Sequence, residues 1–154
     1  MGIDEFQRNP SSYIVKKKKT KLAVPIFKSQ RQVIIVEDDL NTKKMYESFF
    51  ETWSPDYEIF IYSSAINALL DLDSLTPALL VTDLRIPNMN GFEFIKTVRK
   101  KQSFTSIPIV AVTGLTYEEI KQNGGLNQDS LIIKKPIDMS WFKGFIQAII
   151  SLAN

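Results

Sequence analysis

The 154-residue sequence contains no cysteine and no histidine. Their absence excludes thiol catalysis, zinc sites built from these residues, Ser-His-Asp triads and a phosphohistidine formed on this chain. No apolar run approaches the roughly 18 to 20 residues that a membrane-spanning helix needs, and the first residues, MGIDEFQRNP, lack an apolar leader. We therefore expect a cytoplasmic protein with no membrane partner, whose chemistry uses carboxylates, hydroxyls and lysines.

The charge of the chain is small in total and uneven along its length. The formal net charge is +2, but residues 1–31 carry eight Lys or Arg and two acids, whereas residues 32–154 carry eleven and fifteen. The lysine run 16–19 could attract phosphates or an acidic partner, since clustered cations bind anions without reading a sequence. A solvated leader is the simpler interpretation, and we do not expect nucleic acid as a partner.

The hydrophobic pattern divides the chain into two parts. Residues 1–30 show no sustained period, which indicates a basic extension that is either flexible or docked locally through residues 13–15 and 22–27. From Gln32 onward, short apolar runs alternate with amphipathic stretches. A domain of about 100 to 150 residues buries roughly two-thirds of the surface of its unfolded chain and needs no disulfide. We therefore expect one folded domain over residues 31–154.

Five short apolar runs indicate the strands of a parallel sheet. They are mostly β-branched and continuous rather than alternating, which suits strands that are buried on both faces. The runs are Val33–Val36, Tyr57–Tyr62, Ala78–Thr82, Ile107–Val112 and Leu131–Ile133.

A helical pattern follows each of these runs. In the first and the last helix, aromatic and aliphatic residues recur on one face, a pattern typical of a core. Three shorter stretches, 64–72, 91–101 and 116–122, are also predicted to be helical, and Thr116 with Glu119 resembles a capping box. The apolar sets are Met45, Phe49, Phe50 and Trp53 in the first helix and Phe142, Phe145, Ile146 and Ile149 in the last.

The alternation of five strands with five helices predicts the fold class. It implies right-handed β-α-β crossovers, and hence an α/β, three-layer doubly wound fold around a five-stranded parallel sheet. The flavodoxin-like strand order 2-1-3-4-5 puts the third strand in the middle. Ligands of such folds bind beyond the carboxyl ends of the strands, where the strand order reverses. Functional residues should therefore lie at those ends.

Polar side chains follow the carboxyl ends of four of the five strands. They are Glu37, Asp38 and Asp39 after the first, Asp83 after the third, Thr113 after the fourth, and Lys134 and Lys135 after the fifth. Each has a structural explanation alone: Asp39 could cap a helix, Thr113 could be a turn residue, and the lysines could be solvated. Their convergence at one edge is harder to explain by such structural roles, because closely packed carboxylates repel each other unless a cation neutralises them.

A hard divalent cation suits this set of oxygen ligands. Mg²⁺ accepts few protein ligands and keeps several of its waters. A carboxylate beside Mg²⁺ can attack a phosphoryl group and form an acyl phosphate when metal, lysine and hydroxyl groups neutralise the equatorial oxygens. Asp83 ends the middle strand and is the expected nucleophile, with Glu37 and Asp38 holding the metal.

From Gln32 to Asn154 the chain resembles the receiver domain of two-component response regulators. The matching segments, in order and spacing, are IIVEDD at 34–39, VTDLRIPNMNGFEF at 81–94, AVTG at 111–114 and KKP at 134–136. The resemblance implies a phosphoacceptor that takes a phosphoryl group from a histidine kinase or a histidine phosphotransfer protein and then changes its surface towards a downstream protein target. Such a switch is no ordinary enzyme, although it catalyses its own aspartyl phosphorylation and slow dephosphorylation.

The resemblance also implies roles for single residues. Asp83 corresponds to the phosphoacceptor, Thr113 to the hydroxyl residue and Lys135 to the lysine that binds a phosphoryl oxygen. The peptide bond between Lys135 and Pro136 is expected to be cis, and Pro87 and Gly91 match the turn after the phosphoacceptor. The ligands implied for Mg²⁺ or Mn²⁺ are Glu37, Asp38, Asp83 and the backbone carbonyl of Arg85.

The sequence departs from the usual receiver pattern at two positions. Ile132 stands where receivers commonly carry a tyrosine or phenylalanine that moves on activation, so the coupling of Thr113 to such a ring cannot operate in its usual form. Gly114 replaces the commoner alanine and leaves more room beside the site. Arg85 and Leu115 flank the path of the attacking water in this family, and neither positions water, which predicts a phosphorylated state longer-lived than that of a chemotaxis-type regulator.

Two interpretations from other classes compete with the phosphoacceptor. A pseudo-receiver would keep the fold as an interaction module without turning over phosphate, but the acids and Lys135 are intact. A flavodoxin-like cofactor binder would need a phosphate-cradling run of Ser, Thr and Gly after the first strand, where this chain has acids instead. We expect a stand-alone receiver or one excised from a longer protein, and homodimer formation stays open.

Overall fold

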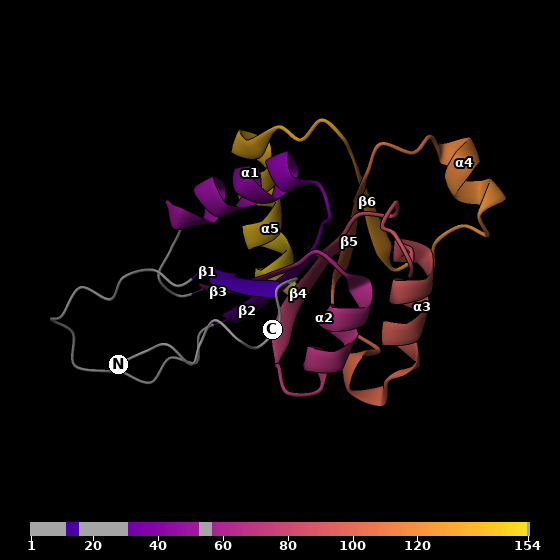
Figure 1. Cartoon of the computed structure of the whole chain (residues 1–154), viewed down its shortest axis with the longest axis horizontal. Coiled ribbons are helices and arrows are strands. Elements are labelled where there is room, and N and C mark those ends of the chain that lie inside the picture. The colour runs from indigo at the N-terminus through magenta and orange to yellow at the C-terminus, as the bar shows by residue number, and fades with distance from the viewer. Residues whose placement is uncertain (1–11, 16–30, 53–56, 154) are drawn as a thin grey trace, which may run out of the picture.

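The computed structural model describes residues 31–52 and 57–153, together with the backbone of residues 12–15 (Figure 1). The described residues do not include residues 22–27, the lysine run 16–19 or Trp53. The elements in chain order are β1 (Ser12–Val15), β2 (Arg31–Val36), α1 (Leu40–Glu51), β3 (Tyr57–Tyr62), α2 (Ala65–Leu72), β4 (Pro77–Thr82), α3 (Gly91–Lys100), a 3-10 turn (Gln102–Phe104), β5 (Ile109–Thr113), α4 (Tyr117–Gln122), β6 (Ser130–Lys134) and α5 (Met139–Leu152).

The sheet has the order β1-β3-β2-β4-β5-β6. Its five strands from β2 onward are all parallel, and their order is the predicted 2-1-3-4-5, so the expected doubly wound fold is confirmed. The sixth strand, β1, was not predicted as a strand, although residues 13–15 were expected to be able to dock. It comes from the N-terminal extension and pairs antiparallel with β3, with Ser12 opposite Tyr62 and Val15 opposite Ile59.

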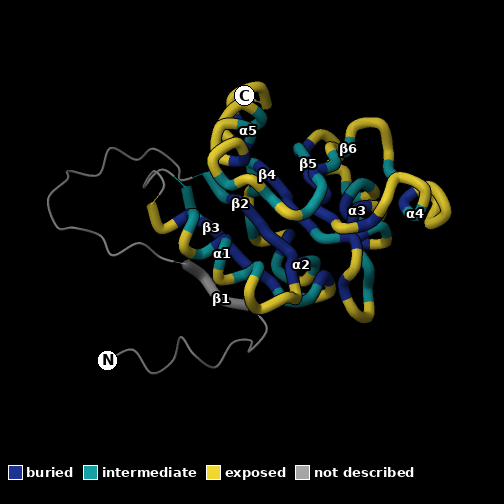
Figure 2. The backbone as a smooth tube through the Cα atoms, turned by 90° about the horizontal axis from the view of Figure 1, so that it is seen from above, coloured by how far each residue is buried: buried dark blue, intermediate teal, exposed yellow. Residues whose placement is uncertain are grey.

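Alternating residues of the parallel strands pack into two separate cores. Val33 and Ile35 of β2 face the layer that α1 and α5 form, where Phe142 and Ile146 are fully buried. The residues between them, Ile34 among them, face α2 and α3 on the other side of the sheet (Figure 1). Figure 2 shows the consequence: β2, β3, β4 and β5 are buried along most of their length, and most exposed residues lie on the helices and in the loops.

Short polar side chains begin the helices. Asp39 caps α1, since its Oδ1 accepts a hydrogen bond from Thr42 N at 2.7 Å. The predicted capping box of α4 is confirmed, because the Thr116 hydroxyl accepts from Glu119 N and the Glu119 carboxylate accepts from Thr116 N. Within the described residues, no helix combines the length and the apolar character needed to cross a bilayer.

Candidate functional site

Backbone hydrogen bonds join the carboxyl ends of the strands to one another. Glu37 N donates to Tyr62 O at 2.9 Å, and Asp83 N donates to Val36 O at 3.0 Å, which ties together the ends of β3, β2 and β4. Lys135 N donates to Thr113 O at 2.9 Å and ties the end of β6 to β5. The residues predicted for the site therefore come from one edge of the sheet.

Lys135 joins the two buried acids of this edge. Its Nζ lies 2.8 Å from Glu37 Oε2 and 2.7 Å from Asp83 Oδ2, and both contacts are ion pairs with hydrogen bonds. The Glu37 side chain is only 2% exposed, and that of Asp83 is 11% exposed. The structure thus brings Glu37, Asp83 and Lys135 into direct contact, although they are far apart in the sequence.

For both Glu37 and Lys135, burial and hydrogen bonding shift the pKa in opposite directions. Burial raises the pKa of Glu37, and the hydrogen bond from Lys135 only partly offsets it. Burial acts to lower the pKa of Lys135, but the hydrogen bonds to Asp83 and Glu37 outweigh burial, so that this pKa is raised. Lys135 is therefore a firmly protonated cation, and it lies against a buried acid whose negative charge is poorly solvated.

The remaining acids of the edge lie nearer to solvent. Asp38 and Asp39 are both exposed. Hydrogen bonds from the backbone and side chain of Thr42 hold the pKa of Asp39 below its usual value, in keeping with its role as a helix cap. Glu37 Oε1 accepts a hydrogen bond from Asp39 N at 3.0 Å. Among the described residues, no group of three or more His, Cys, Asp or Glu side chains is arranged so that it could hold a metal ion.

Thr113 is the last residue of β5, and Arg85 lies in the loop that follows β4. Thr113 is fully buried, and its hydroxyl oxygen accepts a hydrogen bond from Leu115 N at 3.2 Å. Arg85 N donates to Asp83 Oδ1 at 3.1 Å, which holds the second oxygen of that carboxylate. The Arg85 side chain extends away to α4, where its Nη2 lies 2.9 Å from Glu119 Oε1.

Gly91 contributes to the site in a way that the sequence alone did not show. It is the first residue of α3, and its N–H donates to Leu84 O at 3.1 Å. A Cβ atom here would overlap the carbonyl oxygen of Asp83 and lie 2.7 Å from Leu84 Cα. The backbone of α3 therefore packs directly against the backbone of Asp83. A glycine at the start of a helix, where alanine would favour the helix, was the available signal.

One further prediction about this region is confirmed, and the structure also shows where Ile132 lies. The peptide bond between Lys135 and Pro136 is cis, as expected. Ile132 is half-buried, pairs with Ala111 in the sheet and packs against the core on the α2 and α3 side. It thus holds its place by ordinary apolar packing.

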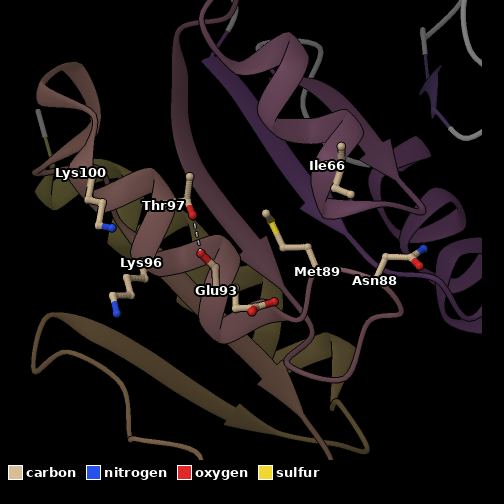
Figure 3. A pocket seen from close by; sticks show the side chains of 7 residues that line it. All are labelled: Ile66, Asn88, Met89, Glu93, Lys96, Thr97 and Lys100. Carbon is tan, nitrogen blue, oxygen red and sulfur yellow. Dashed lines mark hydrogen bonds between the residues drawn. The ribbon is translucent and has the colours of Figure 1, made fainter.

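A groove of about 590 Å³ lies between α2 and α3, and it is lined along α3 from Glu93 to Lys100. Ile66, Asn88, Met89 and Lys96 are among its lining residues (Figure 3). None of the predicted site residues lines it. The chemistry of the strand ends therefore does not extend into this groove.

Comparisons with known proteins give results that agree with one another. The sequence profile of the response regulator receiver domain matches residues 33–146. A polar-differentiation response regulator of Brucella ovis is 28% identical over 116 residues, which cover 73% of this chain and 89% of that protein. Other curated relatives are longer: the chain spans 51% of a response regulator of Synechocystis and 24% of a cyclic di-GMP phosphodiesterase response regulator of Xanthomonas campestris.

Solved structures agree with the fold. A chemotaxis response regulator of Vibrio cholerae superimposes with a TM-score of 0.68 at 24% identity, covering 79% of this chain and 99% of that one. The receiver domain of a sensor histidine kinase of Pseudomonas aeruginosa, solved with a magnesium ion coordinated in its active-site cleft, gives 0.68 at 17% identity, covering 80% and 99%.

Proposed function

The chain belongs to the family of response regulator receiver domains, the phosphoacceptor modules of two-component and phosphorelay signalling, and we propose that Asp83 is the residue that takes the phosphoryl group. The contact of Lys135 Nζ with Asp83 Oδ2 at 2.7 Å carries this proposal. It puts a protonated cation beside the carboxylate at which the negative charge of a phosphoryl group would arrive. Asp83 is also the acid that directly follows β4, the central parallel strand.

The residues around Asp83 would act on the transferring group as follows. An Asp83 oxygen attacks phosphorus, the new P–O bond forms, and the bond from phosphorus to the donor's histidine nitrogen breaks. Lys135 then binds a phosphoryl oxygen, since an ammonium group is a strong donor to phosphate. Thr113 donates its hydroxyl proton to another oxygen, because its own oxygen already accepts from Leu115 N–H. These groups neutralise the charge that the transition state spreads over the phosphoryl oxygens.

The donor atoms at this edge are oxygens, the kind that a hard divalent cation such as Mg²⁺ or Mn²⁺ prefers. Carboxylate oxygens of Glu37, Asp38 and Asp83 and the backbone carbonyl of Arg85 would hold it, with water completing the shell. The fit is supported by Glu37, a buried carboxylate whose pKa burial raises even though Lys135 contacts it. When bound, such a cation neutralises phosphoryl oxygens during transfer.

The partners follow from the same chemistry. The chain has no histidine of its own, so the phosphoryl group would come from a histidine kinase or a histidine phosphotransfer protein, and we place this exchange in the cytoplasm. A downstream protein would read the altered surface. The chain itself would catalyse only its own phosphorylation and a slow dephosphorylation, with no separate substrate.

The assignment of Asp83 can be tested with a matched pair of variants. Full-length protein is incubated with acetyl phosphate and Mg²⁺, and intact mass is measured. Wild type and Asp39→Asn are expected to gain one phosphoryl group, because Asp39 is exposed and caps α1, a role that asparagine fills equally well. Asp83→Asn is expected to gain none, and chelation of the metal should stop the reaction of the other two proteins. Undiminished labelling of Asp83→Asn would overturn the assignment, and an inert wild type would favour the pseudo-receiver.

A further inference from the structure

The ion pair between Arg85 and Glu119 connects the phosphoacceptor loop to α4, across 34 residues of sequence. Arg85 begins beside Asp83, since its N–H donates to Asp83 Oδ1 at 3.1 Å. Its guanidinium Nη2 reaches Glu119 Oε1 at 2.9 Å. The side chains are 67% and 41% exposed, so solvent screens this pair, and such pairs shift an equilibrium by only roughly 1.5- to 5-fold.

Few other contacts hold α4 in position. The helix has six residues, and a helix this short has little stability of its own. Ile120 is its one buried side chain, while Tyr117 is 67% exposed and has Lys134 Nζ 5.8 Å from its ring centroid. Glu119 has two roles: its Oε2 closes the capping box with Thr116 N at 2.7 Å, and its Oε1 holds Arg85. In Figure 1, α4 lies at the margin of the molecule, joined to the sheet by loops.

A phosphoryl group on Asp83 would compete with Glu119 for the same guanidinium. It carries about −1.5 to −2 charges and three strong acceptor oxygens, whereas a glutamate carries one charge. Arginine also binds phosphate through two parallel hydrogen bonds. We propose that Arg85 is a phosphoryl-sensing residue, whose guanidinium leaves Glu119 for the phosphoryl oxygens on Asp83 and thereby loosens α4. This inference rests on the proposed phosphorylation of Asp83.

The structure provides a conservative variant and a matched control for a test. Glu119→Gln keeps an oxygen that can accept from Thr116 N, since glutamine also serves in capping boxes, but it loses the charge that holds Arg85. Glu118→Gln makes the same change of charge one residue earlier on α4, at an exposed position. Hydrogen exchange is read at the amides of Ile120 and Asn123, which donate to Thr116 O and Glu119 O.

Exchange is measured on the full chain before and after treatment with acetyl phosphate and Mg²⁺, with intact mass as the measure of phosphorylation. Phosphorylation should speed exchange in α4 of wild type and of Glu118→Gln by roughly 1.5- to 5-fold. Glu119→Gln should already exchange faster without phosphate and should respond little to it. A phosphorylated Glu119→Gln whose α4 speeds up as much as wild type would overturn the inference and leave the function of Asp83 intact. A wild type that gains no mass would overturn the proposed function and the inference together.

Thermodynamic linkage allows a second test, in which a binding affinity is measured at equilibrium. If Glu119 and the phosphoryl group compete for Arg85, removal of the charge on Glu119 must strengthen binding at Asp83 by the same factor. Beryllium trifluoride, a stable phosphoryl mimic, should therefore bind Glu119→Gln roughly 1.5- to 5-fold more tightly than wild type, with Glu118→Gln unchanged. Equal affinity in all three proteins would contradict the competition for Arg85.

Discussion

Replacing Gly91 by alanine should damage both the fold and the site, because α3 begins in contact with the backbone of the phosphoacceptor. The added Cβ would overlap Asp83 O, and would stand 2.7 Å from Leu84 Cα and 3.0 Å from Asp83 C. Ordinary carbon contacts lie at about 3.5 to 4.0 Å, so either α3 or the loop that follows β4 must move by roughly 1 Å.

The cost can be worked from these contacts. Overpacking costs about 1 to 3 kcal/mol, and this case lies at the upper end because the opposing atoms belong to the backbone. The higher helix propensity of alanine offsets at most about 1 kcal/mol of this cost. A net loss of about 2 kcal/mol should lower the melting temperature by roughly 4 to 8 °C in a chain of this size. A displacement of about 1 Å at Asp83 should slow phosphorylation by up to roughly 100-fold.

Circular dichroism melting and acetyl phosphate labelling measure the two effects. Gly114→Ala is the matched control, since it makes the same change right after Thr113 where no atom lies within 4 Å of the new Cβ. We expect it to melt at or slightly above the wild-type temperature. If Gly91→Ala melts and labels like wild type, the close approach between α3 and Asp83 does not constrain the protein, and the reasoning fails.

Three further predictions concern the core, the end of α3 and the lifetime of the phosphorylated state. Phe142 is fully buried with its ring 6.1 Å from that of Tyr46, so Phe142→Ala should lower the free energy of unfolding by about 3 to 5 kcal/mol in urea titration; a loss below about 1 kcal/mol would contradict this packing. Arg99 Nη1 donates to the carbonyls of Phe104 at 3.1 Å and of residue 107 at 2.7 Å, so Arg99→Met should cost about 1 to 3 kcal/mol by the same titration, and a neutral variant would mean that water replaces the guanidinium. The phosphorylated state, followed by intact mass after removal of the donor, should outlast that of a chemotaxis-type regulator, and rapid decay without a phosphatase would refute this prediction.

Helix starts were predictable from the sequence because capping is a local interaction. Thr116 and Glu119 are three residues apart, and each satisfies the other's backbone N–H. Asp39 could be seen as a cap for the same reason, and it has that role in addition to its place among the acids. No tertiary contact is needed to identify such capping residues, so their neighbours in the sequence were enough to predict them.

The limits of the strands were harder to predict because pairing decides them. The apolar run that starts at Ile107 suggested a strand from that residue, but β5 begins at Ile109. Pro108 has no N–H to offer the sheet, and only its carbonyl takes part, accepting from Leu80 N at 3.0 Å. The pairing of β1 with β3 joins segments about 45 residues apart in the sequence, and no local pattern reports such a contact.

The gathering of the proposed site residues at one edge could be predicted, whereas their contacts could not. Parallel strands end at a common edge, so Asp83, Glu37 and Lys135 had to be neighbours. That Lys135 contacts both acids depends on its rotamer and on the path of the loop that follows β6. The same limit applies to Tyr46, which is 1% exposed and packs on α5. The apolar pattern of α1 had predicted the residues around it, and not Tyr46 itself, as core residues.

The antiparallel strand β1 also has a consequence for how copies of this protein behave at high concentration. Without it, β3 would present a row of unpaired backbone N–H and C=O groups, a template on which another chain can grow a sheet and start aggregation. β1 pairs with Ile59 to Tyr62 and replaces that edge with one of only four residues. Four lysines follow it directly in the sequence, and short edges with nearby lysines discourage edge-to-edge association. Deletion of residues 1–30 should therefore promote precipitation, which light scattering during storage would detect.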